Sequence, residues 1–151
     1  QARVLSYGGE LEVHGHLLRS LSISANAAWV LLDNQTDGYP LPFTPPLSLR
    51  ATLSWKVPWI PLRYGSLTLE GENFYAMAQE RVSRNELTTP SAWHADAKVV
   101  YTKQFGETEW TLRGAVKNLT DRRYFNHLSY YRALGIPEPG RSFNLELTVS
   151  Y

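Results

Sequence analysis

The chain has 151 residues, a formal net charge of +1 at pH 7 and no cysteine. This length normally corresponds to one domain, and the near-neutral charge argues against nucleic-acid binding, which needs a basic patch or stripe. The lack of cysteine excludes disulfides and thiolate metal sites, and no apolar run approaches the ~20 residues of a membrane helix. The chain opens inside a strand-like pattern without a signal peptide at Gln1, so we expect it to be a piece of a longer polypeptide.

Seven segments alternate between apolar and polar residues with a period of two, which predicts β-strands that each have one apolar face. In chain order they cover residues 7–17, 21–31, 47–57, a segment from 66 up to the loop at 79–90, 92–103, 110–118 and 140–151. The segment 47–57 has the clearest pattern, because Leu49 and Leu53 alternate with Arg50. The segment from 66 is the least regular, because Asn73 falls on its apolar face and Phe74 on its polar face.

The connections between these segments alternate between short and long. Short connections cover 18–20, 58–64 and 104–108, whereas long ones cover 33–46, 79–90 and 120–139. This asymmetry is typical of bacterial outer-membrane barrels, which have short periplasmic turns and long extracellular loops. Aromatic residues gather at both ends of the segments: Trp55, Trp59, Tyr64, Tyr101, Phe105, Trp110 and Tyr151 toward the short turns, and Trp29, Tyr75 and Trp93 toward the long loops. Two such belts are typical of lipid interfaces.

The placement of charged residues and the length of the segments distinguish a membrane barrel from a soluble β-sandwich. In the seven segments, Asp, Glu, Lys and Arg all fall on the polar face. A soluble β-sandwich also alternates, but these segments are roughly twice the ~5–6 residues of an average strand. They are long enough to cross a bilayer when tilted. The sequence therefore predicts an all-β protein, an antiparallel transmembrane β-barrel whose apolar faces contact outer-membrane lipid.

Three motifs carry a resemblance to a known family. The segment 116–124, VKNLTDRRY, resembles the V-x-N-L-[FT]-D-[KR]-x-Y segment of TonB-dependent outer-membrane receptors. Pro139-Gly140-Arg141, followed by an alternating strand that ends on Tyr151, resembles their C-terminal strand. The segment LPFTPPL at 41–47 resembles the sequence that leads from a loop into a strand in these receptors. The resemblance covers essentially the whole chain, so residues 1–151 are interpreted as the last seven strands of such a barrel.

The resemblance implies a 22-stranded barrel whose lumen is closed by an N-terminal plug domain. It implies the import of a scarce nutrient, such as an iron–siderophore, haem, cobalamin or a metal chelate, across the bacterial outer membrane with energy from TonB. The implied partners are outer-membrane lipid, the remaining strands and plug of the same receptor, TonB and a surface lipoprotein. No cofactor and no metal site within this chain are expected. Two alternatives stay open: a self-contained small outer-membrane barrel with a structural or adhesive role, and a soluble β-sandwich binding module.

The motif residues have structural interpretations. Asn118 and Asp121 stand where a strand becomes a loop, where their side chains can cap backbone groups. Pro139 and Gly140 set the turn into the last strand, and Arg141 is expected to pair with a carboxylate. The residues assigned a structural role in this way are Asn118, Leu119, Asp121, Tyr124, Pro139, Gly140, Arg141 and Tyr151.

Arginine and tyrosine side chains in the long loops are the candidate ligand-binding groups. Arg forms charge-assisted bonds with carboxylates and phosphates, and Tyr stacks on flat ligands, so both suit an anionic chelate. The candidates are Arg81, Arg84, Arg122, Arg123, His127, Tyr130, Tyr131 and Arg132. An ordinary solvated loop is the competing interpretation. His14 and His16 could chelate a metal but fit a hydrated wall better. Because no serine in a nucleophile elbow accompanies His94 and Asp96, no enzymatic activity is expected.

Overall fold

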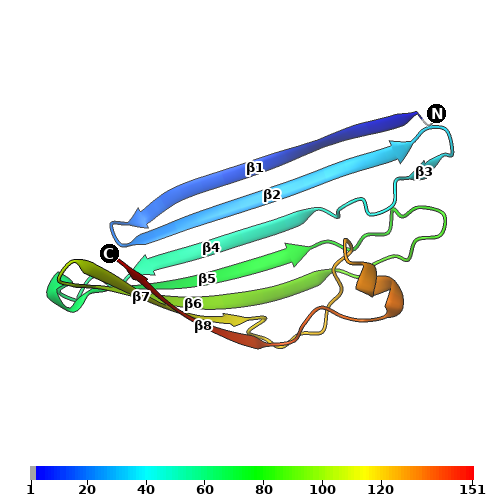
Figure 1. Ribbon diagram of the computed structural model, residues 1–151. Helices are drawn as coiled ribbons and strands as arrows, with labels where there is room; N and C mark the ends of the chain where they lie inside the picture. Colours follow the sequence, from blue (N-terminus) through cyan, green and yellow to red (C-terminus); the bar gives the residue numbers. More distant parts are fainter. Residues whose placement is uncertain (1–2) are drawn as a thin grey trace.

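The computed structural model describes residues 3–151, which form one antiparallel β-sheet (Figure 1). Its strands are β1 (Val4–Leu18), β2 (Leu21–Asn34), β3 (Tyr39–Pro40), β4 (Ser48–Lys56), β5 (Ser66–Ala76), β6 (Ala92–Phe105), β7 (Thr108–Lys117) and β8 (Ser142–Ser150). Two short 3-10 helices, η1 (Leu62–Tyr64) and η2 (Tyr130–Leu134), lie in the connections. Among the described residues, no helix has the length and apolar character that a membrane crossing requires.

The seven long strands are the seven predicted segments, and they pair in sequential order as β1-β2-β4-β5-β6-β7-β8. The prediction of an all-β, antiparallel arrangement is therefore confirmed. The short strand β3 was not predicted, because it lies inside a loop that reads as irregular. There Asn34 accepts the backbone N–H of Thr36 on its side chain, and Gly38 adopts a positive φ of 70°, so the chain folds back onto the end of β2.

The irregular half of β5 keeps its register with both neighbours. Asn73 pairs with Ala95, and Phe74 pairs with His94, without a bulge. Phe74 therefore lies on the polar face of the sheet, where its ring contacts that of His94 in a tilted arrangement, with centroids 5.1 Å apart. An aromatic contact between neighbouring strands explains why an apolar residue occupies this position.

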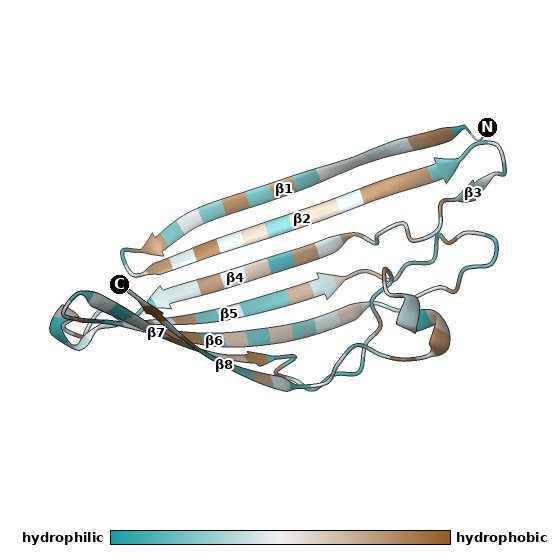
Figure 2. Cartoon of the chain, in the orientation of Figure 1, coloured by the Kyte–Doolittle hydropathy of each residue, from teal (hydrophilic) through white to brown (hydrophobic). Residues whose placement is uncertain are grey.

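The apolar face of the sheet is uncovered. Figure 2 shows brown residues alternating with paler and teal ones along the strands. Among the described residues, only two hydrophobic side chains, Val57 and Ala92, are buried, whereas Leu145 is 79% exposed. A single sheet without a covering layer has no water-excluding core, so its apolar face needs an apolar environment.

The opposite face carries ion pairs that join neighbouring strands from β4 to β8. They are Arg50–Glu72, Lys98–Glu70 at 2.8 Å, Lys117–Asp96 at 2.8 Å and Arg113–Glu146 at 2.8 Å. Cross-strand pairs of opposite charge stabilise a sheet by a few tenths of a kcal/mol to about 1 kcal/mol each. Strands β1 and β8 each have one long neighbour and do not pair with each other, so the sheet formed by the described residues is open.

Candidate functional site

The long connections all emerge at one end of the sheet, as Figure 1 shows. We call residues 35–47 the first loop, 77–91 the second loop and 118–141 the third loop. The opposite end carries only the turns at 19–20, 57–65 and 106–107. The predicted alternation of connections thus places the candidate binding residues, which belong to the second and third loops, at the same end of the sheet.

The motif at 116–124 holds the two ends of the third loop together. Asn118 and Asp121 have positive φ angles of 49° and 53°, a conformation that Asn and Asp tolerate better than other non-glycine residues. The Asn118 amide donates to the carbonyls of Arg122, at 2.8 Å, and Pro139, at 3.2 Å. Its own oxygen accepts the Arg122 N–H at 3.0 Å. One side chain therefore holds both the start and the end of this loop.

Asp121 completes the clamp at the entrance to β8. Its Oδ1 atom accepts the backbone N–H of Arg141 at 2.8 Å. A Cβ atom at Gly140 would lie 2.9 Å from the same oxygen, so a larger residue there would displace the Asp121 carboxylate. The predicted pairing of the Arg141 side chain with a carboxylate stays a prediction, because the ion pairs of the described residues do not include it. Arg141 meets the Asp121 carboxylate through its backbone N–H.

Aromatic stacking draws the third loop over the polar face of the sheet. The ring of Tyr124 stacks on His94 with centroids 4.9 Å apart and planes 16° from parallel. His94 in turn contacts Phe74, and the Arg50 guanidinium lies 5.2 Å from the Phe74 centroid. Burial, reinforced by the Glu138 and Asp96 carboxylates, raises the pKa of the Tyr124 hydroxyl, so this anchor is neutral at pH 7.

A carboxylate from the second loop bonds both of the other loops. Oε1 of Glu86 accepts the Phe43 N–H of the first loop at 2.9 Å, and Oε2 accepts the N–H of Ser83 at 3.1 Å. From the third loop, Nη2 of Arg132 reaches the Glu86 Oε1 atom at 3.1 Å. The Glu86 and Arg132 side chains are only 8% and 7% exposed. This is a buried charge pair supported by further hydrogen bonds, as buried charges require, although the Arg132 Nε atom is buried without a hydrogen-bond partner among the described residues.

Thr89 and His127 extend this cluster. Arg132 donates to Thr89 Oγ1 at 3.0 Å and also to the carbonyl of Leu87. Because the Thr89 oxygen accepts from Arg132, its hydroxyl proton is free for His127 Nδ1, 2.8 Å away. This assignment puts the histidine proton on Nε2, which lies 3.2 Å from Glu86 Oε1 but lacks hydrogen-bond geometry.

The protonation states of the cluster follow from burial and neighbouring charge. Burial opposes ionisation of Glu86, but the backbone N–H groups of Phe43 and Ser83 and the charges of His127 and Arg132 together lower its pKa below the ordinary 4.5. Burial, followed by repulsion from Arg132, lowers the pKa of His127 below 6.5, against the opposing pull of Glu86. At neutral pH the cluster therefore holds an ionised Glu86, a charged Arg132 and a neutral His127. We call Glu86, Thr89, His127 and Arg132 the Glu86 cluster.

The structure divides the predicted ligand-binding residues into two groups. His127 and Arg132 are buried in the Glu86 cluster, where they bond protein groups. The others lie at the surface: Arg81 pairs with Asp33 at 2.8 Å, Arg84, Arg122 and Arg123 lie over the rings of Tyr39, Trp93 and Phe125, and Tyr130 and Tyr131 are 77% and 65% exposed. The surface group is the one accessible to a ligand.

Beneath the third loop lies a cavity of about 360 Å³, within the usual size range of ligand sites. Its lining combines Arg50, Phe74 and His94 from the sheet with Tyr124 and His127 from the loop. Sequence reasoning missed both this cavity and Glu86, because neither has a periodic signal. The described residues contain no group of three His, Asp or Glu side chains that could hold a metal ion.

A protein-family model described as "TonB dependent receptor-like, beta-barrel" matches residues 2–119. The chain belongs to this family. No curated protein is a significant sequence match. The match of the family model stops at residue 119, inside the motif at 116–124, and so does not extend over the rest of the third loop or β8.

Two solved structures resemble the chain along nearly its whole length. The copper transporter OprC superposes with a TM-score of 0.81 at 22% identity, over 95% of this chain and 23% of that one. The ferric preacinetobactin receptor BauA from Acinetobacter baumannii superposes with a TM-score of 0.74 at 18% identity, over 98% of this chain and 22% of that one. The chain therefore spans less than a quarter of either protein. At these identities the likeness establishes the fold.

Proposed function

We propose that residues 1–151 are the C-terminal part of the barrel of an outer-membrane receptor that imports a scarce nutrient with energy from TonB. The observation that carries this proposal is a single sheet with an exposed apolar face and an ion-paired polar face, in a chain of the TonB-dependent receptor family. In such a barrel the apolar face meets lipid and the polar face lines the lumen.

The proposed partners follow from the open edges of the sheet. Strands β1 and β8 each leave one row of backbone N–H and C=O groups without a long neighbour among the described residues. In lipid these groups need partners, because unsatisfied groups cost several kcal/mol each. We propose that the other strands of the same receptor supply them and that its plug fills the lumen. The open edges argue against a self-contained small barrel.

The proposed substrate is an anionic metal chelate, such as an iron–siderophore or haem. The support comes from the surface of the loop end, where Tyr130 and Tyr131 are exposed and the guanidinium groups of Arg84 and Arg122 lie over aromatic rings. Tyrosine supplies stacking area and arginine supplies charge-assisted bonds. The proposed activity is transport and no enzymatic step.

The test is to measure uptake by the whole receptor that carries this chain, placed in the outer membrane of a bacterium lacking other importers. We expect saturable uptake of one class of radiolabelled chelate, and we expect that uptake to disappear when TonB is deleted. A matched strain with the receptor deleted controls for diffusion through porins. The proposal fails if the receptor fractionates away from the outer membrane, or if no chelate shows uptake that depends on TonB.

A further inference from the structure

The three loops form one connected unit, and the connections converge on a single carboxylate. Gln79 of the second loop donates from its side chain to the carbonyl of Thr44 in the first loop at 2.8 Å. All other buried side-chain contacts between the loops belong, among the described residues, to the Glu86 cluster. The only charged partner that reaches both the first and third loops is Glu86.

Glu86 holds the first loop in a conformation that is unfavourable by itself. Phe43 has a φ of 57°, which is a genuine outlier for a bulky side chain. Such a conformation persists only when surrounding contacts maintain it. The hydrogen bond from the Phe43 N–H to Glu86 is one such contact. The Phe43 ring then lies 4.8 Å from the Tyr130 ring, so Glu86 also sets the position of the surface against which Tyr130 packs.

Glu86 holds the third loop through Arg132. This arginine lies inside η2, between the exposed Tyr131 and the exposed Leu134. Removing its carboxylate partner would leave a buried guanidinium without a counter-charge, which is strongly destabilising. The simplest relief is for η2 to swing outward until Arg132 reaches water. Because Tyr130 and Tyr131 belong to the same helical turn, they would move with it.

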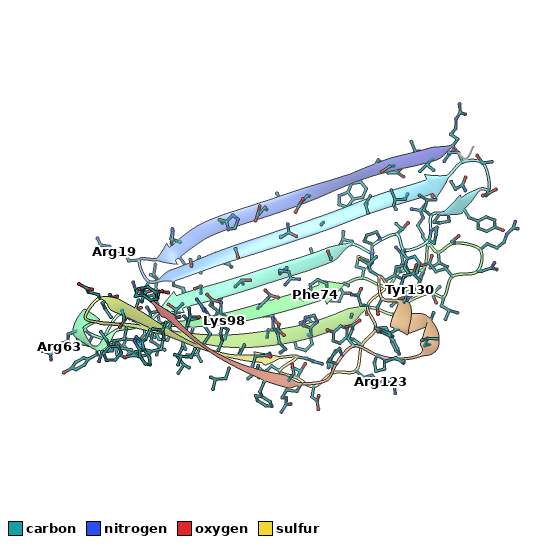
Figure 3. The ribbon with its side chains drawn as sticks, viewed as in Figure 1. Arg19, Arg63, Phe74, Lys98, Arg123 and Tyr130 are labelled. Carbon is teal, nitrogen blue, oxygen red and sulfur yellow. The ribbon has the colours of Figure 1, made fainter. Side chains whose placement is uncertain are left out.

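We propose that Glu86 is a positioning residue, which fixes Tyr130 and Tyr131 for ligand binding at the loop end without touching the ligand itself. This inference rests on the proposed function, because it assigns these tyrosines to the ligand surface. Figure 3 shows Tyr130 among the loops, at the far end of the sheet from Arg19 and Arg63. With a side chain only 8% exposed, Glu86 acts through the loops it holds.

Other carboxylates of the loop end do not have this role. The Arg81–Asp33 pair is partly exposed, with Arg81 48% accessible, and exposed pairs contribute little. Asp121 joins the two ends of the third loop but reaches neither of the other loops. Loss of either would leave the contacts of Phe43 and Arg132 intact.

The experiment uses the whole receptor in the outer membrane, with a cysteine introduced by Leu134→Cys and labelled with a nitroxide. The variants are Glu86→Ala and Glu86→Gln, and the matched control is Glu80→Ala, which removes an exposed carboxylate from the same loop. Label mobility by electron paramagnetic resonance reports the third loop, whereas chelate binding and uptake report the ligand surface. Heat-modifiable gel mobility identifies folded barrels.

We expect Glu86→Ala to increase label mobility and to raise the half-saturation concentration for uptake by roughly 10-fold or more, with the maximal rate per receptor unchanged. A loss that was merely structural would lower the maximal rate instead. Glu80→Ala is expected to match the unsubstituted receptor in every readout. If Glu86→Ala gives no folded barrel, Glu86→Gln, which keeps an acceptor for the Phe43 N–H, decides by the same readouts.

The inference is overturned if a folded Glu86 variant shows unchanged label mobility, or if mobility rises while the half-saturation concentration stays the same. If the unsubstituted receptor imports no chelate, the proposed function fails on its own, since the resonance spectrum still reports whether Glu86 positions the loop. A mobile label in that receptor's Glu86 variants would uphold the positioning of Tyr130 and Tyr131, and an immobile one would refute it.

Discussion

At the scale of single residues, backbone strain and side-chain capping coincide at the ends of the third loop. Asn118 is almost fully buried, and its side chain makes three hydrogen bonds while its backbone adopts a left-handed conformation. The strain and the bonds compensate each other, because the left-handed turn is what aims the amide at the carbonyls of Arg122 and Pro139. The motif therefore stabilises the entry to β8 at the position where the chain returns from its longest loop.

Asn118→Ala should destabilise the barrel by about 3 kcal/mol, at ~1 kcal/mol for each hydrogen bond lost. Asn118→Gly loses the same bonds but tolerates the positive φ, so it should recover about 1 kcal/mol. The measurement is the temperature at which the receptor loses its folded gel mobility. Equal midpoints for Asn118→Ala and the unsubstituted receptor would show that the clamp has no role in stability.

The Glu86 cluster gives the loops a pH dependence of one sign. Glu86 and His127 both have a lower pKa in the folded protein than their ordinary values of 4.5 and 6.5. At a pH above those ordinary values, the ionised Glu86 and the neutral His127 contribute their full stabilisation to the folded loops. This stabilisation is lost as the pH falls through each folded-state pKa. The charged groups facing His127 are Glu86 and Arg132. Protonated His127 would therefore add a cation beside Arg132, and protonated Glu86 would remove the counter-charge of both.

Acidification should therefore loosen the third loop in two steps, first below pH 6.5 and then below pH 4.5. The mobility of the nitroxide at position 134 measures both steps. His127→Gln should remove the upper step and leave the lower one, because it removes only the first titrating group. Increasing mobility as the pH rises from about 5 to about 7 would contradict the sign derived from the linkage relation.

Residue-level prediction from the sequence succeeded where the chemistry is local. The left-handed positions at Asn118 and Asp121 agree with residue types that favour turns, and only short-range bonding is needed to expect them. The Glu86 cluster could not be predicted in this way. The hydrogen bonds between its two loops join residues 38 to 46 positions apart along the chain, and nothing in a single sequence indicates which loop residues meet.

At the scale of secondary-structure elements, alternation predicted the strands because each strand has one face in each of two environments. At the loop end, both strands are three residues longer than predicted. Strand β1 starts at Val4 and not at residue 7, and β2 ends at Asn34, which pairs with Val4, and not at residue 31. These residues extend beyond the clear alternation, so periodicity could not detect them. The pairing partner, and not the local sequence, extends the strands there.

The two faces of β8 should respond differently to charge. Leu145 lies on the exposed apolar face, whereas Asn144 lies opposite Ala115 on the polar face. Leu145→Arg should cost about 2–4 kcal/mol in a bilayer if the residue is near mid-membrane, and Asn144→Arg should cost far less. The folding free energy of the whole receptor barrel in lipid vesicles measures both. Equal costs would refute the assignment of lipid-facing and lumen-facing residues.

At the scale of the whole molecule, the sheet lacks both of the usual ways to become stable. Within residues 3–151 it has no second layer to cover its apolar face, and its edge strands β1 and β8 do not meet. Sequence patterning predicts such a sheet, because alternation reports faces and strand lengths. It does not report closure, since closure depends on strands that pair across the barrel. The 22-strand count implied by the family therefore stays a prediction.

Expressed alone, residues 1–151 should fail to give a stable monomer. In hydrocarbon, each unpaired backbone group along β1 and β8 costs several kcal/mol. In water, the same edges template aggregation. Closing β8 directly onto β1 would form a narrow barrel, whose lumen would have to enclose the ion pairs from Arg50–Glu72 to Arg113–Glu146 with little water. Burying so many charges together is unfavourable unless each is fully hydrogen-bonded.

The measurement is to refold the isolated 151-residue chain in detergent beside the whole receptor, and to determine its mass by light scattering and its heat-modifiable gel mobility. We expect aggregates or heterogeneous oligomers without a heat-modifiable band, whereas the whole receptor gives one. Adding the remaining strands and plug as a separate polypeptide should recover the folded band, because it supplies partners for both edges. A monodisperse, heat-modifiable monomer of the isolated chain would instead establish that β1 and β8 can pair directly, and would favour a self-contained small barrel.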